Sequence, residues 1–178
     1  MKSLKTIQSF AKVGKVLSTI AFVVSIVGVC LSAAGIVTYA IFGNGAVKIG
    51  DVTIQSLIEK EVKLSDAGLY TLLAAGAAAC AAEIFIAAKA KKYFTHELEE
   101  GTPFTLPLAK EMRSLGIFAL IVSLVTGFVC SVGIAIMEKY APELEQNANA
   151  AFGSVGIAVA FIVVSFICEY GAEIKGKE

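Results

Sequence analysis

Residues 16–41 read VLSTIAFVVSIVGVCLSAAGIVTYAI and contain no charged side chain. Three further apolar runs occupy residues 67–88, 114–137 and 148–168, and Glu83 is the single charge within them. The shortest run has 21 residues, which as a helix extend about 31 Å and cross the ~30 Å hydrocarbon core of a bilayer. Because the runs are apolar throughout rather than at every second residue, they predict transmembrane helices and not barrel strands.

The composition agrees with a membrane location. Hydrophobic residues make up 57% of the 178-residue chain and charged residues 17%, whereas soluble domains have about 45–50% and about 25%. So few charges could not cover the apolar surface of a soluble domain of this size. Fifteen basic and fifteen acidic residues cancel, so no strong positive field points to nucleic acid. The sequence predicts one all-α membrane domain over residues 1–178, a four-transmembrane-helix bundle in contact with the lipid bilayer.

The basic residues indicate the orientation of the four spans. Eleven lie before the first span, in the loop 89–113 or in the C-terminal tail, against four on the other side. By the positive-inside rule, both termini and the loop 89–113 are expected to be cytoplasmic, in a cell membrane. The extracytoplasmic segment 42–66 is expected to form a small cap, with a β-hairpin around Gly50-Asp51 and a helical turn or two after it. A ligand or peptide receptor is the alternative for this segment.

The first and third spans resemble each other when shifted by 98 residues. The residues that recur are Ala11, Lys12, Leu17, Ala21, Val24, Ser25 and Val27. The second and fourth spans align more weakly at a shift of 77. The pattern predicts a tandem duplication of a two-helix hairpin, with chance similarity between apolar helices as the alternative. The second span is rich in Ala and Gly and is expected to pack on other helices, whereas the first and third are expected to face lipid.

The loop 89–113 has clear helix-ending signals. The second helix is expected to continue past the membrane to Glu100, because Gly101 favours a helix end and Pro103 prevents continuation. Thr105 can cap the helix that follows. The loop therefore predicts a sharp connection between two helices rather than a long flexible segment.

Residues 99–116, EEGTPFTLPLAKEMRSLG, resemble a loop of the YoaS-like family of small bacterial membrane proteins, a domain of unknown function. That loop reads Gly-x-Pro-Phe-Thr, then a short helix, then Leu-Arg-x-x-Gly. Gly101, Pro103, Phe104 and Thr105 match the first part, whereas residues 112–116 keep only the Arg and the Gly of the second. The resemblance implies a bacterial four-span fold, often encoded beside a small helix-turn-helix regulator. It implies no known activity and therefore transfers no functional residues.

Glu83 is the candidate for intramembrane chemistry. A charged side chain in the middle of a transmembrane helix costs roughly 2.5–3.5 kcal/mol and needs a partner or water. Lys12, Lys15 and Arg113 lie toward the same side of the membrane and are its candidate partners. The carboxyl group is either half of a structural ion pair or a proton or cation site. Sequence alone leaves both readings open.

The remaining reactive residues predict no enzyme, metal or cofactor. The four cysteines occur one per span and at different depths, which does not suit a zinc site. His96 is expected on a solvated helix surface. No Ser-His-Asp pattern and no glycine loop before a lysine is present.

These observations favour a non-enzymatic membrane protein that acts through protein partners, as a regulator, an immunity or stress factor, or an accessory subunit. The expected partner-binding residues of the cytoplasmic loop are Glu99, Gly101, Pro103, Phe104, Thr105 and Lys110. A homodimer is a further expectation. The main alternative is a small dimeric transporter or channel that uses Glu83 as a proton- or cation-coupled site, and the third is a purely structural membrane protein.

Overall fold

The computed structural model describes residues 2–42, 48–49, 52–53, 66–137, 139 and 153–175. Four long helices make up most of them: α1 (Lys2–Phe42), α3 (Asp66–Glu100), α4 (Leu106–Met137) and α5 (Gly153–Lys175). Each of the four is long and apolar enough to cross a membrane. The chain is therefore an all-α, multi-pass membrane protein, as the sequence predicts.

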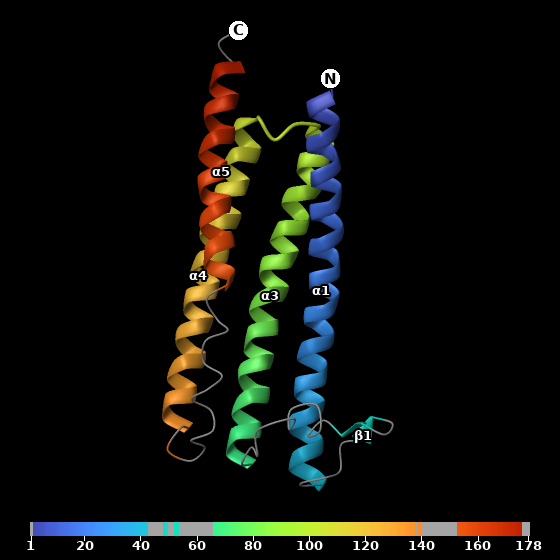
Figure 1. Ribbon diagram of the computed structural model, residues 1–178, viewed down its shortest axis with the longest axis vertical. Coiled ribbons are helices and arrows are strands. Elements are labelled where there is room, and N and C mark those ends of the chain that lie inside the picture. The colour runs from blue at the N-terminus through green and yellow to red at the C-terminus, as the bar shows by residue number, and fades with distance from the viewer. Residues whose placement is uncertain are drawn as a thin grey trace.

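Both ends of the chain and the connection between α3 and α4 lie at the same end of the molecule (Figure 1). We call this the inner end, after the predicted orientation, and the opposite one the outer end. α3 ends at Glu100, as predicted, and its 35 residues extend about 52 Å, well beyond a ~30 Å hydrocarbon core. α5 begins at Gly153, and residues 148–152 of the predicted fourth span lie outside the described residues.

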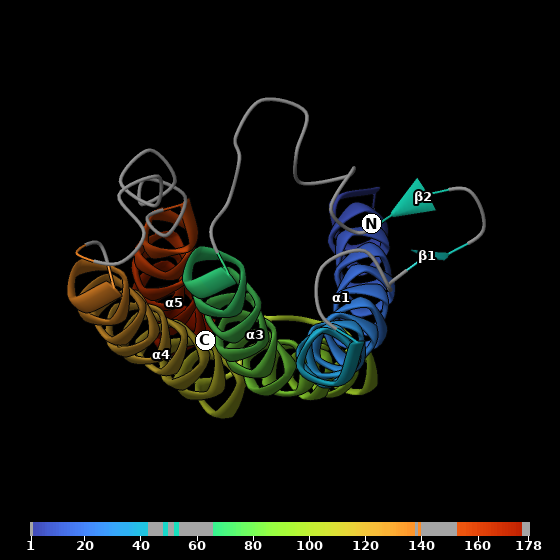
Figure 2. The ribbon, with the colours of Figure 1, turned by 90° about the horizontal axis from the view of Figure 1, so that it is seen from below.

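The helices pack as two antiparallel pairs set side by side. α1 packs on α3, α4 packs on α5, and α3 joins the pairs through its contact with α4. Viewed from the outer end, α1 lies on one flank, α3 in the middle, and α4 with α5 on the other flank (Figure 2). The arrangement is an open four-helix bundle, because among the described elements α1 makes its extensive contact with α3 alone.

Small residues let α1 approach α3 closely along its length. They follow one another at spacings of three and four: Ala11, Gly14, Ser18, Ala21, Ser25, Gly28, Ser32 and Gly35. A Cβ atom at Gly14 would lie 2.6 Å from the Phe94 ring, and one at Gly28 would lie 2.6 Å from Cys80 Sγ. A three-four spacing places all of these residues on one side of the helix, so this one face of the first span packs on α3.

The large apolar residues of α1 and α4 lie on the outside. Val24 and Val16 of α1, and Phe128 and Val129 of α4, are all more than half exposed. In a bilayer these surfaces contact lipid chains, which are as apolar as the side chains themselves. The exposed apolar surface therefore fits a membrane environment.

The connection between α3 and α4 uses its glycine as predicted. Gly101 has a positive φ of 75°, which a residue without a Cβ adopts readily. Its N–H donates to the Glu97 carbonyl at 3.0 Å and completes an αL helix cap. Thr105 begins the next turn through its backbone, because its carbonyl accepts the Ala109 N–H at 3.0 Å. Its hydroxyl has no hydrogen-bond partner among the described residues, so its side chain does not cap the helix.

Two short strands lie between α1 and α3. β1 (Lys48–Ile49) pairs antiparallel with β2 (Val52–Thr53), with Lys48 opposite Thr53 and Ile49 opposite Val52. This pairing agrees with the predicted hairpin. The expected helical turns after it lie outside the described residues, and the role of the segment as a cap stays a prediction.

Candidate functional site

The Gly-x-Pro-Phe-Thr residues fold inward at the inner end. Pro103 is buried, and Phe104 packs on the core. A Cβ atom at Gly171 of α5 would lie 2.8 Å from the Phe104 ring, so this glycine makes room for it. The Gln8 side-chain amide donates to the Gly101 carbonyl at 3.3 Å and ties α1 to the connection. The motif thus contacts both α1 and α5 from the connection between α3 and α4.

The six predicted partner-binding residues therefore divide into two groups. Glu99 and Lys110 are exposed, and both are accessible to a partner at the inner end. Gly101, Phe104 and Thr105 are half-buried, and Pro103 is buried. The motif is first of all a packing motif, because its central residues contact the chain itself.

A buried cluster lies directly beneath this connection. Its members are Tyr93 of α3, Leu108, Ala109, Met112 and Leu115 of α4, and Cys168 of α5. We call it the inner core. Glu97, one helical turn beyond Tyr93 on the same face of α3, is only 8% exposed. The inner core thus places a buried carboxyl group where three helices and the connection meet.

Glu97 and Tyr93 both lie beyond the apolar run 67–88, and both are shifted toward their neutral forms. Burial raises the pKa of the Glu97 carboxyl, and the nearby Tyr93 hydroxyl offsets this in part. Burial and the Glu97 carboxylate together raise the pKa of Tyr93. The Tyr93 hydroxyl lies near the Glu97 carboxyl but does not complete a hydrogen bond to it or to any other described residue. Glu97 was not predicted as a site residue, although it lies seven residues after Ala90 and four after Tyr93, spacings that place it on the packed face of α3.

Polar contacts surround the inner core and hold its helices together. His96 Nδ1 of α3 lies 2.9 Å from the Glu111 carboxylate of α4, so His96 is not simply solvated as predicted. Arg113 of α4 pairs with Glu169 of α5, and its guanidinium lies 4.3 Å from the centre of the Phe166 ring. These contacts link α3 to α4 and α4 to α5 at the same end of the molecule.

Lys89 adds a further link between α3 and α4. Its Nζ donates to the Ser114 hydroxyl at 3.0 Å and to the Ser114 carbonyl at 3.3 Å. The same ammonium group lies 4.5 Å from the centre of the Phe118 ring. Lys89, which directly follows the apolar run 67–88, is therefore held by hydrogen bonds and by a cation–π contact.

The predicted ion site around Glu83 is not assembled. Among the described residues Glu83 makes no ion pair, and Arg113 pairs with Glu169 instead. Gly14 of α1 lies against Phe94 of α3, which is about three helical turns from Glu83 along the same helix. Lys15, the next residue of α1, therefore lies about 15 Å from Glu83 along the helix axis. Lys12 lies a further turn toward the inner end. Residues on one side of the membrane can differ in depth by several helical turns, so these cations do not reach Glu83.

Glu83 instead lines a small cavity between α3, α4 and α5. The cavity measures about 140 Å³, and Ser123 and Ala158 are among its other lining residues. Most of its wall is apolar. The side chain of Glu83 is exposed, and its setting offers one hydroxyl group and no cation among the described residues.

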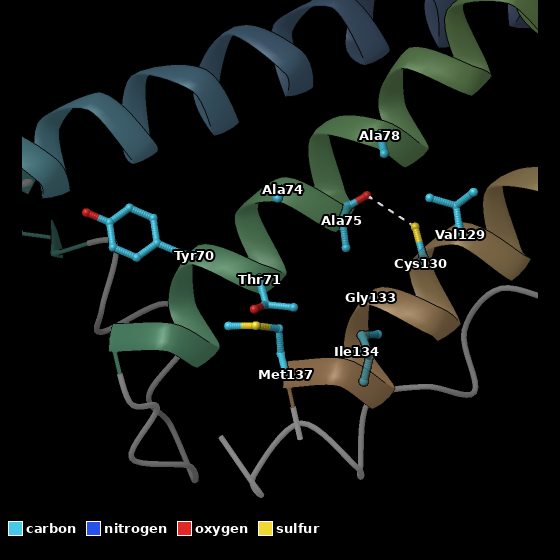
Figure 3. Close-up of a pocket in the computed structure, with 10 residues that line it drawn as sticks. All are labelled: Tyr70, Thr71, Ala74, Ala75, Ala78, Val129, Cys130, Gly133, Ile134 and Met137. Atoms are coloured by element: carbon cyan, nitrogen blue, oxygen red, sulfur yellow. Dashed lines mark hydrogen bonds between the residues drawn. The ribbon is translucent and has the colours of Figure 1, made fainter. Parts of the chain in front are cut away.

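A larger groove of about 410 Å³ lies between the outer halves of α3 and α4. Figure 3 shows the ten residues that line it: Tyr70, Thr71, Ala74, Ala75, Ala78, Val129, Cys130, Gly133, Ile134 and Met137. Cys130 Sγ lies 4.0 Å from the Ala75 carbonyl. The small residues of α3 form much of the floor, and Val129, Ile134 and Met137 of α4 lie on the opposite side.

The reactive residues do not gather into a metal site within the described part of the chain. The four cysteines are free, and they range from exposed Cys30 to buried Cys168. Cys168 belongs to the inner core and acts there as a small apolar residue.

No protein-family model, curated protein or solved structure matches this chain.

Proposed function

We propose that this protein is a non-enzymatic, multi-pass membrane protein that acts by binding a partner membrane protein, as a regulator, an immunity or stress factor, or an accessory subunit. The groove between α3 and α4 carries this proposal. Its floor includes Ala74, Ala75 and Ala78, and Gly133 lies on the opposite wall. Transmembrane helices associate through small residues that let backbones and side chains approach closely. The groove therefore suits a transmembrane helix of a partner, and exposed Glu99 and Lys110 can add polar contacts at the inner end.

Crosslinking from within the groove tests this proposal. A photoreactive amino acid at Ala78 of the full-length protein in native membranes is expected to form an adduct with one discrete protein. Gly133→Leu is expected to reduce that adduct about tenfold, because the new side chain enters open space in the groove and a loss of about 1.4 kcal/mol in binding corresponds to tenfold.

Phe128 provides the matched control for this experiment. It lies on α4, is 71% exposed and faces away from the groove, so a photoreactive residue there is expected to label lipid. Equal labelling of lipid from both positions would contradict the proposal. An adduct between two copies of the chain would identify the partner helix as one of its own.

A small transporter or channel is the second candidate, and the Glu83 cavity is the observation that favours it. An unpaired carboxyl at this depth is costly, and such residues mark ion or proton pathways in membrane proteins. Glu83→Gln is expected to abolish proton- or cation-driven flux in reconstituted vesicles. Glu99→Gln, which changes an exposed carboxyl at the inner end, should leave flux unchanged. Normal flux in the Glu83 variant would remove this candidate.

We also propose that the chain arose by tandem duplication of a two-helix hairpin. Two pairs of equivalent residues support this, because both members of each pair are buried. Ala11 and Ala109, which the shift of 98 equates, are both buried, and so are Ser18 and Gly116. The pairs α1–α3 and α4–α5 would then be two copies of one hairpin. Cytoplasmic termini, a cell-membrane location and kinship with the YoaS-like family complete the proposed picture.

A further inference from the structure

Glu97 is a buried acid without a cation to balance it. Its side chain is buried beside the inner core, and no ion pair joins it to any described residue. A carboxylate removed from water without a partner is strongly disfavoured, whereas the neutral acid is tolerated. The packed arrangement thus requires a proton on Glu97.

The groups around Glu97 offer no compensating charge. The titratable groups near this level are Lys92, Tyr93, His96, Glu99 and Glu100 of α3, Lys12 of α1, Lys110, Glu111 and Arg113 of α4, and Cys168 and Glu169 of α5. The cations among them are directed elsewhere: His96 contacts Glu111 and Arg113 pairs with Glu169. The three lysines are exposed. Tyr93 and Cys168 can only be neutral or negative. Ionised Glu97 would therefore need water.

Glu97 lies at a place where water can enter by a simple movement. The seam between the pairs α1–α3 and α4–α5 ends here, and the Glu97 carbonyl accepts the Gly101 N–H that starts the connection. The connection of residues 101–105 is the covalent link between the two pairs at this end. Parting of the pairs about this link would expose the carboxylate without unfolding any helix.

We propose that protonated Glu97 closes the inner end of the seam between the two helix pairs, and that loss of its proton opens it. The sign follows from linkage. The closed state binds the proton more tightly than the open state, so closure is favoured at low pH and is weakened as pH rises above the ordinary pKa of a carboxyl group. The inner end is thus a proton-sensitive element, separate from the groove that the proposed partner occupies.

Cys168 is a built-in reporter of this opening. It is 5% exposed in the closed inner core, so a thiol reagent reaches it only when the seam parts. N-ethylmaleimide labelling of the full-length protein in lipid vesicles, resolved by peptide mass spectrometry, measures its rate. Glu97→Gln keeps the shape of the side chain and cannot ionise. In the natural protein the negative charge of Glu97 repels the nearby Cys168 thiolate, which slows labelling and cannot mimic the expected rise.

The rate of Cys168 labelling in the natural protein, divided by that in the Glu97→Gln variant, is expected to be only a few-fold above one at pH 5, which lies just above the ordinary pKa of a carboxyl group. By pH 9 it is expected to rise about tenfold for each unit by which closure raises the pKa of Glu97. Glu99→Gln, two residues away and exposed, should behave as the natural protein does.

A ratio that stays at one from pH 5 to pH 9 would overturn the proposal. Glu97→Met supplies a second non-ionising variant should the buried amide disturb folding, and it should remove the pH response in the same way. Equal labelling of Glu97→Met and the natural protein at every pH would assign the opening to another group and equally reject Glu97.

Discussion

Replacing Gly116 with leucine is expected to separate α4 from α5 and to lower the free energy of unfolding by about 3 kcal/mol. A Cβ atom at this position would lie 3.0 Å from the Ala158 carbonyl oxygen and 3.0 Å from the Ile162 backbone nitrogen. Backbone atoms of a helix cannot turn aside as a side chain can, so the helices must move apart. The gain in helix propensity of about 1 kcal/mol over glycine does not offset this loss of packing. Unfolding of the purified protein in mixed micelles measures the change.

Gly156→Leu is the matched control for this substitution. Gly156 lies on α5, and beyond its chain neighbours and its own helix backbone no described atom is within 4 Å of where its Cβ would be. The same glycine-to-leucine change there should leave stability equal or slightly higher. Equal stability of the two variants would show that α4 and α5 do not approach each other at Gly116.

Leu115→Ala is expected to destabilise the inner core by about 2 kcal/mol, the low end of the range for leucine truncation in soluble proteins. Leu115 is 2% exposed and contacts the cluster that includes Tyr93 and Met112. The lower value is expected because a membrane helix leaves its partners for lipid rather than for water, so lost packing dominates and transfer from water contributes little. The same micelle unfolding measurement gives the change.

Leu124→Ala provides the comparison for Leu115. Leu124 lies on the same helix and is 50% exposed, so its truncation removes contacts with lipid rather than with the protein. A change within about 0.5 kcal/mol is expected there. If both truncations cost the same, the inner core would not be the packed centre that the structure describes.

Much of the fold follows from local properties of the chain. Apolar runs long enough to cross a bilayer produced the four helices, and the helix end at Glu100 followed from Gly101 and Pro103. The paired strands around Gly50-Asp51 also follow from neighbouring residues. These features depend on contacts within a few residues or on solvent polarity, so the order of residues is sufficient to predict them.

The candidate site depended on contacts between helices, and here the predictions were less successful. Glu83 attracted attention because it interrupts an apolar run, yet its expected partner Arg113 binds Glu169. Glu97 was overlooked because it stands in a charged stretch that looks solvated. The relative depth and rotation of two helices decide which charges meet, and neither can be obtained from the composition of one segment.

The sequence by itself determined that residues 16–41, 67–88, 114–137 and 148–168 belong in a membrane, because lipid accepts only long apolar segments whose backbone is satisfied internally. Only the tertiary structure decided that the small residues of α1 face α3, that an open groove remains between α3 and α4, and that Glu97 is buried without a cation. These outcomes arise where helices from distant parts of the chain meet. In lipid that meeting depends on close packing of particular side chains rather than on hydrophobicity, which all four helices share.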